Sequence, residues 1–134
     1  MTQYLAKVLG LWIVLTELGM VANRQTSIAV LNALFTNPTL MWVIGVFTML
    51  VGLAIVVAHN RWLGSPAAVI ITLYGWIATI KGLTFVWLPT RIQLDFFQAL
   101  QFPRFFYAYF ILGFALGGYL IYAGFRDPSR GSVA

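Results

Sequence analysis

Four apolar stretches, separated by polar and turn-forming residues, set the pattern of this chain. Each runs for about 18 to 23 residues, which at 1.5 Å per residue is enough for a helix to cross the hydrocarbon core of a bilayer. They cover residues 4–21, 40–58, 66–88 and 105–125. The pattern therefore predicts an all-α polytopic membrane protein, a four-transmembrane-helix bundle that forms a single membrane domain over residues 1–134.

The two long connections between these stretches are amphipathic. In residues 23–39 and again in residues 91–102, apolar side chains recur at helical spacing. They are Ile28, Leu31, Leu34 and Phe35 in the first connection, and Ile92, Phe96 and Leu100 in the second. This spacing is typical of short helices that lie in the plane of the membrane interface. The connection between the second and third stretches is a tight turn, so we expect both interfacial helices on the same side of the membrane.

Composition supports the membrane assignment and excludes several kinds of site. Of the 134 residues, 61% are hydrophobic and 8% are charged, and the mean hydropathy is +0.90, whereas about a quarter of an average soluble domain is charged. There are no cysteines and one histidine, which excludes disulfides, cysteine metal sites and bis-histidine haem within one chain. The net charge of +5 is scattered, as in membrane-flanking residues, so we expect no nucleic-acid partner.

The two halves of the chain resemble each other. An offset of 64 residues aligns Trp12 with Trp76 and Glu17 with Lys81, and an offset of 65 aligns Pro38 with Pro103, Gly52 with Gly117 and Arg61 with Arg126. We predict a parallel duplication of a helix–interfacial helix–helix unit, with repeat 1 over residues 1–64 and repeat 2 over residues 65–130. Such halves are related by a pseudo-two-fold axis along the membrane normal.

Glu17 and Lys81 are charged residues inside apolar stretches, where a charge is costly and needs a partner. Because the repeat places them at equal depth, we predict an intramembrane ion pair, which offsets much of that cost. Two alternatives stay open. Glu17 can be a protonatable carboxylate in a transport path, and Lys81 can extend its ammonium to the interface.

Three aromatic or imidazole side chains are candidate ligand contacts. Trp12 and Trp76 lie near mid-span, where core packing competes with stacking on a cationic ligand. His59 follows the second stretch and reads as a headgroup-level residue, although a single histidine can also ligate haem or chlorophyll. The aromatic run over residues 102–110 can pack on lipid, a pigment or another subunit.

Glycine spacing predicts close helix packing. Gly113 and Gly117 form a small-xxx-small face in the fourth stretch, and Gly75 and Gly82 lie seven residues apart in the third. Such faces let helices approach closely, either within the bundle or against a partner.

Three motifs carry a family resemblance: Asn37-Pro38, His59-Asn60 with Trp62, and Thr72-Leu73 followed by Gly75-Trp76 and Lys81-Gly82. Over residues 37–89 they resemble an uncharacterised family of small bacterial four-span integral membrane proteins. That resemblance implies a bacterial inner membrane and names no catalytic residue. A weaker similarity is to small multidrug-resistance transporters, which also have four spans and a membrane glutamate in the first. Their connections are not long and amphipathic, and here Lys81 would compete for the carboxylate of Glu17.

The expected function follows from these patterns. The chain shows no nucleophile–base pair, metal-ligand cluster or phosphate loop, so we expect neither an enzyme nor a bound metal or cofactor. We expect a structural or accessory subunit that packs against other membrane subunits, or a homo-oligomer, in the lipid bilayer. The alternatives are a small proton-coupled transporter that uses Glu17, and a lipid- or pigment-binding protein. Basic residues favour cytoplasmic termini: Lys7, Arg61, Arg126 and Arg130 lie on the side of the termini, against Arg24, Arg91 and Arg104 on the other.

Overall fold

The computed structural model describes residues 1–101 and 103–126, and helices with no strands make up the regular secondary structure of that part of the chain. Phe102, Arg130 and the end of the predicted second repeat lie outside the described residues. The helices are α1 (Thr2–Ala22), α2 (Arg24–Thr36), α3 (Pro38–Ala58), α4 (Pro66–Trp87), α5 (Thr90–Ala99) and α6 (Phe106–Phe125). Four of them, α1, α3, α4 and α6, are long and apolar enough to cross a membrane. The prediction of an all-α protein with four spans is confirmed.

Local sequence explains where α3 and α4 begin. The side-chain oxygen of Asn37 accepts a hydrogen bond from the backbone N–H of Leu40 at 3.0 Å, and Ser65 caps Ala68 in the same way at 3.3 Å. In each case a proline follows the cap at the first helical position, where its missing N–H costs nothing. The turn before Ser65 is made by Gly64 at φ +119°, a conformation that favours glycine.

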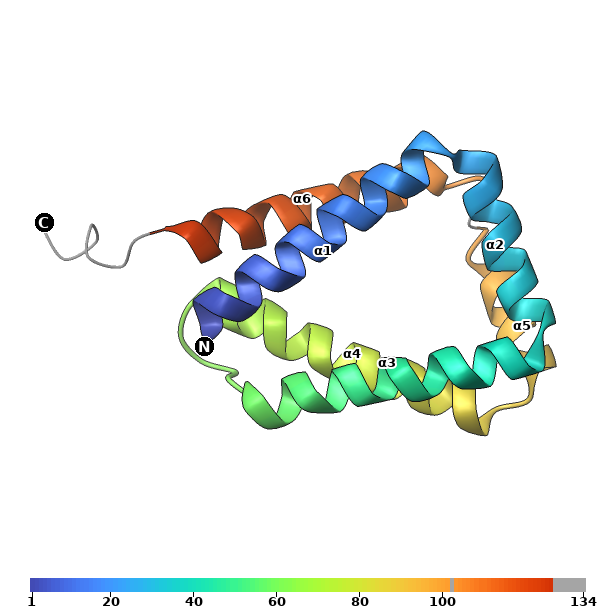
Figure 1. Ribbon diagram of the computed structural model, residues 1–134, viewed down its shortest axis with the longest axis horizontal. Helices are drawn as coiled ribbons and strands as arrows, with labels where there is room; N and C mark the ends of the chain where they lie inside the picture. The colour runs from blue at the N-terminus through green and yellow to red at the C-terminus, as the bar shows by residue number, and fades with distance from the viewer. Residues whose placement is uncertain (102, 127–134) are drawn as a thin grey trace, which may run out of the picture.

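The four spans pack as two antiparallel pairs, α1 with α6 and α3 with α4 (Figure 1). The pairs meet where α1 and α4 begin and α6 ends, and they diverge toward the opposite end of the molecule. There α2 and α5 lie across the space between the pairs and contact each other (Figure 1). Both short helices are therefore on the side away from the N-terminus, as the sequence predicts.

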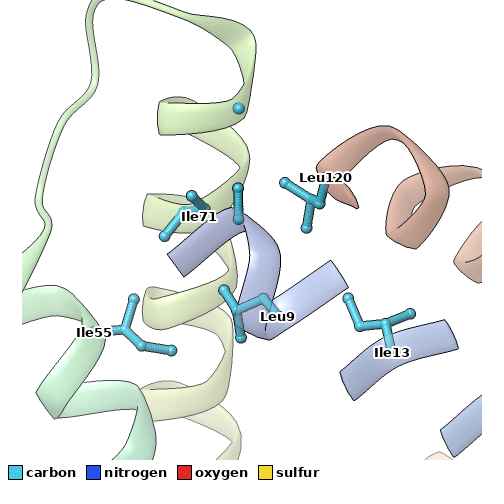
Figure 2. Close-up of a cluster of buried hydrophobic side chains, with 7 residues drawn as sticks. Leu9, Ile13, Ile55, Ile71 and Leu120 are labelled. Atoms are coloured by element: carbon cyan, nitrogen blue, oxygen red, sulfur yellow. The ribbon is translucent and has the colours of Figure 1, made fainter. Parts of the chain in front are cut away.

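Two apolar clusters hold this arrangement together. At the end where the pairs meet, side chains from α1, α3, α4 and α6 converge, as Figure 2 shows. They are Ala6, Leu9, Ile13, Ile55, Ala67, Ile71 and Leu120. At the other end the second cluster consists of Phe35, Met41 and Phe97, with Phe85 of α4 packed on it. The rings of Phe35 and Phe97 stack at 4.3 Å and so join α2 to α5.

The amphipathic pattern of α5 divides into a packed face and an exposed face. Gln93 and Phe97 are buried against the rest of the chain, and the amide nitrogen of Gln93 donates to the carbonyl of Leu88 at 2.9 Å at the end of α4. The predicted apolar stripe is exposed instead, with Ile92 52% and Phe96 68% accessible. An exposed apolar face on a helix at the end of the spans fits a helix lying in the interface.

The glycines singled out by their spacing lie at contacts within the chain. Gly75 and Gly82 of α4 lie against Ile55 and Met49 of α3. Gly113 and Gly117 of α6 lie against α1, at Glu17 and at Ile13 with Val14. These residues therefore serve internal packing between paired helices.

The contacts repeat between the two halves with one offset. Gly117 lies against Val14 as Gly52 lies against Thr79. Gly10 lies against Ile121 as Gly75 lies against Val56. In both comparisons the offset between corresponding residues is 65 positions in the sequence. With this offset α1 corresponds to α4 and α3 corresponds to α6, so the contact of α1 with α6 has its counterpart in the contact of α4 with α3. Such packing is what a parallel repeat would produce, while the duplication itself stays a prediction.

Candidate functional site

Among the charged residues of the four spans, Lys81 is the one whose side chain is exposed. It lies on α4, six residues before that helix ends at Trp87, or about 9 Å along the helix axis. The residue is exposed, and its ammonium lies 5.5 Å from the centroid of the Phe85 ring, one turn further along. This contact turns the amine toward the end of the molecule that carries α2 and α5.

The face of α4 that carries Lys81 is bounded by aromatic contacts. Tyr74, two turns before Lys81, makes an edge contact with Trp12 of α1 at 6.3 Å. Phe85, one turn after it, makes an edge contact with Phe35 of α2 at 5.9 Å. Lys81 therefore sits between the point where α1 and α4 touch and the aromatic cluster beneath α2 and α5.

Glu17 occupies a different interface. Its carboxylate packs against Gly113, where α1 and α6 are close together, and an added Cβ at that glycine would overlap the carboxylate. Its Oε2 atom is buried and has no hydrogen-bond partner among the residues that the structure describes. A carboxylate oxygen without a donor is expensive in an apolar setting, so Oε2 is held in a specific location without a hydrogen bond that would stabilise its charge.

The predicted ion pair between Glu17 and Lys81 is not made in this structure. The reason is the register of the repeat. With the offset of 65 that the contacts follow, Lys81 corresponds to Thr16, and Glu17 corresponds to Gly82. The offset of 64 used to pair the two charges is one residue short, and one residue turns a helical side chain by about 100°. Glu17 consequently faces α6, whereas Lys81 lies beside the face of α4 that contacts α3.

Thr16 lines a hollow on the inner side of the corner between α1 and α2. The hollow has a volume of about 460 Å³, and its wall also includes Gly19 of α1 with Ser27 and Val30 of α2. Gly19 has open space where a side chain would be. A second hollow, of about 390 Å³, lies at the opposite end between α1, α4 and α6. Neither hollow contains a carboxylate that could meet Lys81.

The candidate tryptophans do not come together. Trp12 contacts Tyr74 and is 54% exposed. Trp76 lies on another face of α4, where its indole nitrogen is 3.4 Å from the side-chain oxygen of Asn60. The two rings therefore do not form an aromatic cage around a cation.

His59 is buried, with 2% of its surface exposed, rather than directed to the headgroups. Its Nε2 atom lies 3.4 Å from the hydroxyl of Thr2, so the imidazole connects the end of α3 to the start of α1. Burial lowers the pKa of His59, and the positive charges of Arg61 and the N-terminal amine lower it further. Among the described residues no group of three side chains is arranged to hold a metal ion.

Arg24 has a structural role that sequence reasoning missed. Its guanidinium donates to the carbonyl of Pro103 at 2.8 Å and lies 5.2 Å from the ring centroid of Phe106. It therefore connects the start of α2 to the segment before α6, while its Nε atom is buried and has no partner within the described part of the chain. The proline and aromatic residues around position 103 are the signal in the sequence, but a contact over 79 positions is visible only in the fold.

Comparison of the chain with known protein families, with curated proteins and with solved structures finds no match.

Proposed function

We propose that this protein is a non-enzymatic integral membrane subunit that packs against a larger membrane complex in a structural or accessory role. The observation that carries the proposal is Lys81, an ammonium on an exposed face of a span with no carboxylate beside it in the described chain. Charged residues in spans are costly and usually pair with one another. A partner that supplies the missing anion would remove that cost.

The diverging helix pairs support the same proposal. Between 22% and 33% of the apolar window of each span is buried within the chain, so most of each span is open to contact. Lipid tails are as apolar as leucine, and polar groups and close packing therefore decide which helices associate in a membrane. Lys81 gives one of these open surfaces a group that can select a partner.

We place the protein in a bacterial inner membrane with both termini in the cytoplasm. This rests on the family resemblance of residues 37–89 and on the small excess of basic residues near the termini. The end that carries α2 and α5 would then face the periplasm. A reporter fused at either terminus would test the orientation.

The proposal is tested by crosslinking in native membranes followed by gentle extraction and native mass spectrometry. A photoreactive residue at Ile77, which is 62% exposed one turn before Lys81, should yield one stoichiometric complex with another membrane protein. The matched control is the same residue at Ile111 of α6, which is 70% exposed and should not crosslink to that protein. A chain that is recovered only as a monomer or homodimer would refute the accessory role.

Glu17 supports a second candidate, a small proton-coupled transporter. The buried Oε2 atom without a hydrogen-bond donor is a group for which taking up a proton removes a costly charge. In proteoliposomes carrying a pH gradient, Glu17→Gln should abolish proton movement while the helical content stays unchanged. Proton movement that persists in this variant would exclude the transport mechanism through Glu17.

A further inference from the structure

The surroundings of Lys81 restrict what can meet its ammonium. Phe85 lies between Lys81 and the end of the molecule that carries α2 and α5. It packs on the cluster formed by Phe35, Met41 and Phe97. The ammonium of Lys81 lies against the face of the Phe85 ring and does not extend past that ring toward α2 and α5. A lipid phosphate at the level of α2 and α5 is thus separated from Lys81 by aromatic side chains, and an anion reaches it more directly from beside α4.

The chain's own carboxylates do not fit that position. Glu17 is packed against Gly113 between α1 and α6, with one oxygen buried. Asp95 belongs to α5, which is not one of the spans. Within the described residues, the carboxylate that a second copy of this chain would offer in a span is Glu17, which is half-buried and packed against Gly113, with Oε2 enclosed. A carboxylate on a helix of a different protein is free of that packing.

We propose that Lys81 docks a transmembrane helix of a different protein through an Asp or Glu side chain at the depth of Lys81. This inference rests on the proposed accessory function and names the chemistry of the partner. The partner helix lies along the face of α4 between Tyr74 and Phe85, with Ile77 in the contact. At a usual interhelical distance of about 8–10 Å, a carboxylate from that helix reaches the ammonium in place of the ring of Phe85.

The test uses the full chain reconstituted in phosphatidylcholine vesicles with designed transmembrane peptides of leucine and alanine. The peptides carry one Glu, one Gln or one Lys at the depth of Lys81, and association is followed by energy transfer between fluorophores. We expect the Glu peptide to bind about ten-fold more tightly than the Gln peptide, near the upper range of polar contacts between membrane helices. Lys81→Met should abolish this preference, Lys81→Arg should keep it, and Lys81→Glu should shift it to the Lys peptide.

Lys7 provides the matched control. It is also a lysine in a span with its ammonium over a phenylalanine, 4.7 Å from the ring of Phe125, but at the opposite end of the molecule. Lys7→Met should leave the preference for the Glu peptide unchanged. Equal binding of the Glu and Gln peptides to the unaltered chain would overturn the inference, as would a preference that survives Lys81→Met.

Three further results separate this inference from the proposed function. If phosphatidylglycerol is retained on purification in a Lys81-dependent way while the peptides are not distinguished, the occupant is an anionic lipid and the inference fails. If the complex crosslinked at Ile77 persists in Lys81→Met, the accessory role holds but a carboxylate is not what docks it. If the Glu peptide is selected but no complex exists in native membranes, the face of α4 that carries Lys81 can bind a helix with a carboxylate, but the accessory role is refuted.

Discussion

Replacing Gly10 with alanine should push α1 away from α6. An added Cβ would lie 2.8 Å from the backbone nitrogen of Ile121 and 2.9 Å from the carbonyl oxygen of Gly117. Both atoms belong to the backbone of α6, so rotating a side chain relieves neither contact. The helices would have to separate by about 0.6 Å to restore an ordinary contact, which weakens dispersion along the interface. Overpacking of this kind costs about 1–3 kcal/mol.

The control for this variant is Gly19→Ala on the same helix. An added Cβ at Gly19 meets nothing within 4 Å, so this substitution gains only the helix propensity of alanine, about 1 kcal/mol. Gly10→Ala gains the same propensity, which makes its net loss about 1 kcal/mol and sets the two variants about 2 kcal/mol apart. The free energy of unfolding is measured by titration with sodium dodecyl sulfate in mild detergent, followed by circular dichroism. Equal stability of the two variants would refute the close approach of α1 and α6.

Three further outcomes are expected. Because Glu17 and Lys81 do not meet, the effects of Glu17→Gln and Lys81→Met on stability should add within about 0.5 kcal/mol in a double-mutant cycle; larger coupling would mean that the two side chains interact in the membrane. Thr72→Val should cost about 1–2 kcal/mol in the same titration, since the buried Thr72 hydroxyl accepts a hydrogen bond from the backbone N–H of Arg61 at 2.9 Å; unchanged stability would show that this bond is dispensable. Because the pKa of His59 is lowered in the folded chain, the unfolded chain binds a proton at this residue more readily. The contribution of His59 to stability should therefore be complete above about pH 6.5 and lost as the pH falls through the folded-state pKa. His59→Gln should remove this pH dependence, and an unchanged profile of stability against pH would contradict the prediction.

The positions of the helices were predictable because their causes are local. Apolar runs of spanning length identify a transmembrane helix without reference to any other part of the chain. The cap-and-proline pairs at Asn37-Pro38 and Ser65-Pro66 act within a single turn. The amphipathic connections are also helices. In α5, however, Gln93 and Phe97 are buried against the rest of the chain, while the predicted apolar stripe that includes Phe96 is exposed. Apolar periodicity alone does not distinguish a face that packs on protein from one that lies in lipid.

The site was less predictable because it depends on how helices are rotated about their axes. An offset of 64 residues aligns Glu17 with Lys81, whereas the packing of the helices follows an offset of 65. Both offsets are compatible with the letters of an apolar repeat, which contains many chance identities. Only the contacts between packed helices, such as Gly52 against Thr79 and Gly117 against Val14, decide between them.

Sequence by itself therefore determined the class of this protein, its four spans and the side on which its two short helices lie, since hydropathy, caps and turns act over a few neighbouring residues. Tertiary structure decided that the spans diverge as two pairs, that Glu17 is packed against Gly113, and that Lys81 is left open beside Phe85. The physical reason is that a helix turns by about 100° per residue. A one-residue difference in register, which composition does not reveal, decides whether two charged residues in the spans meet or face different neighbours.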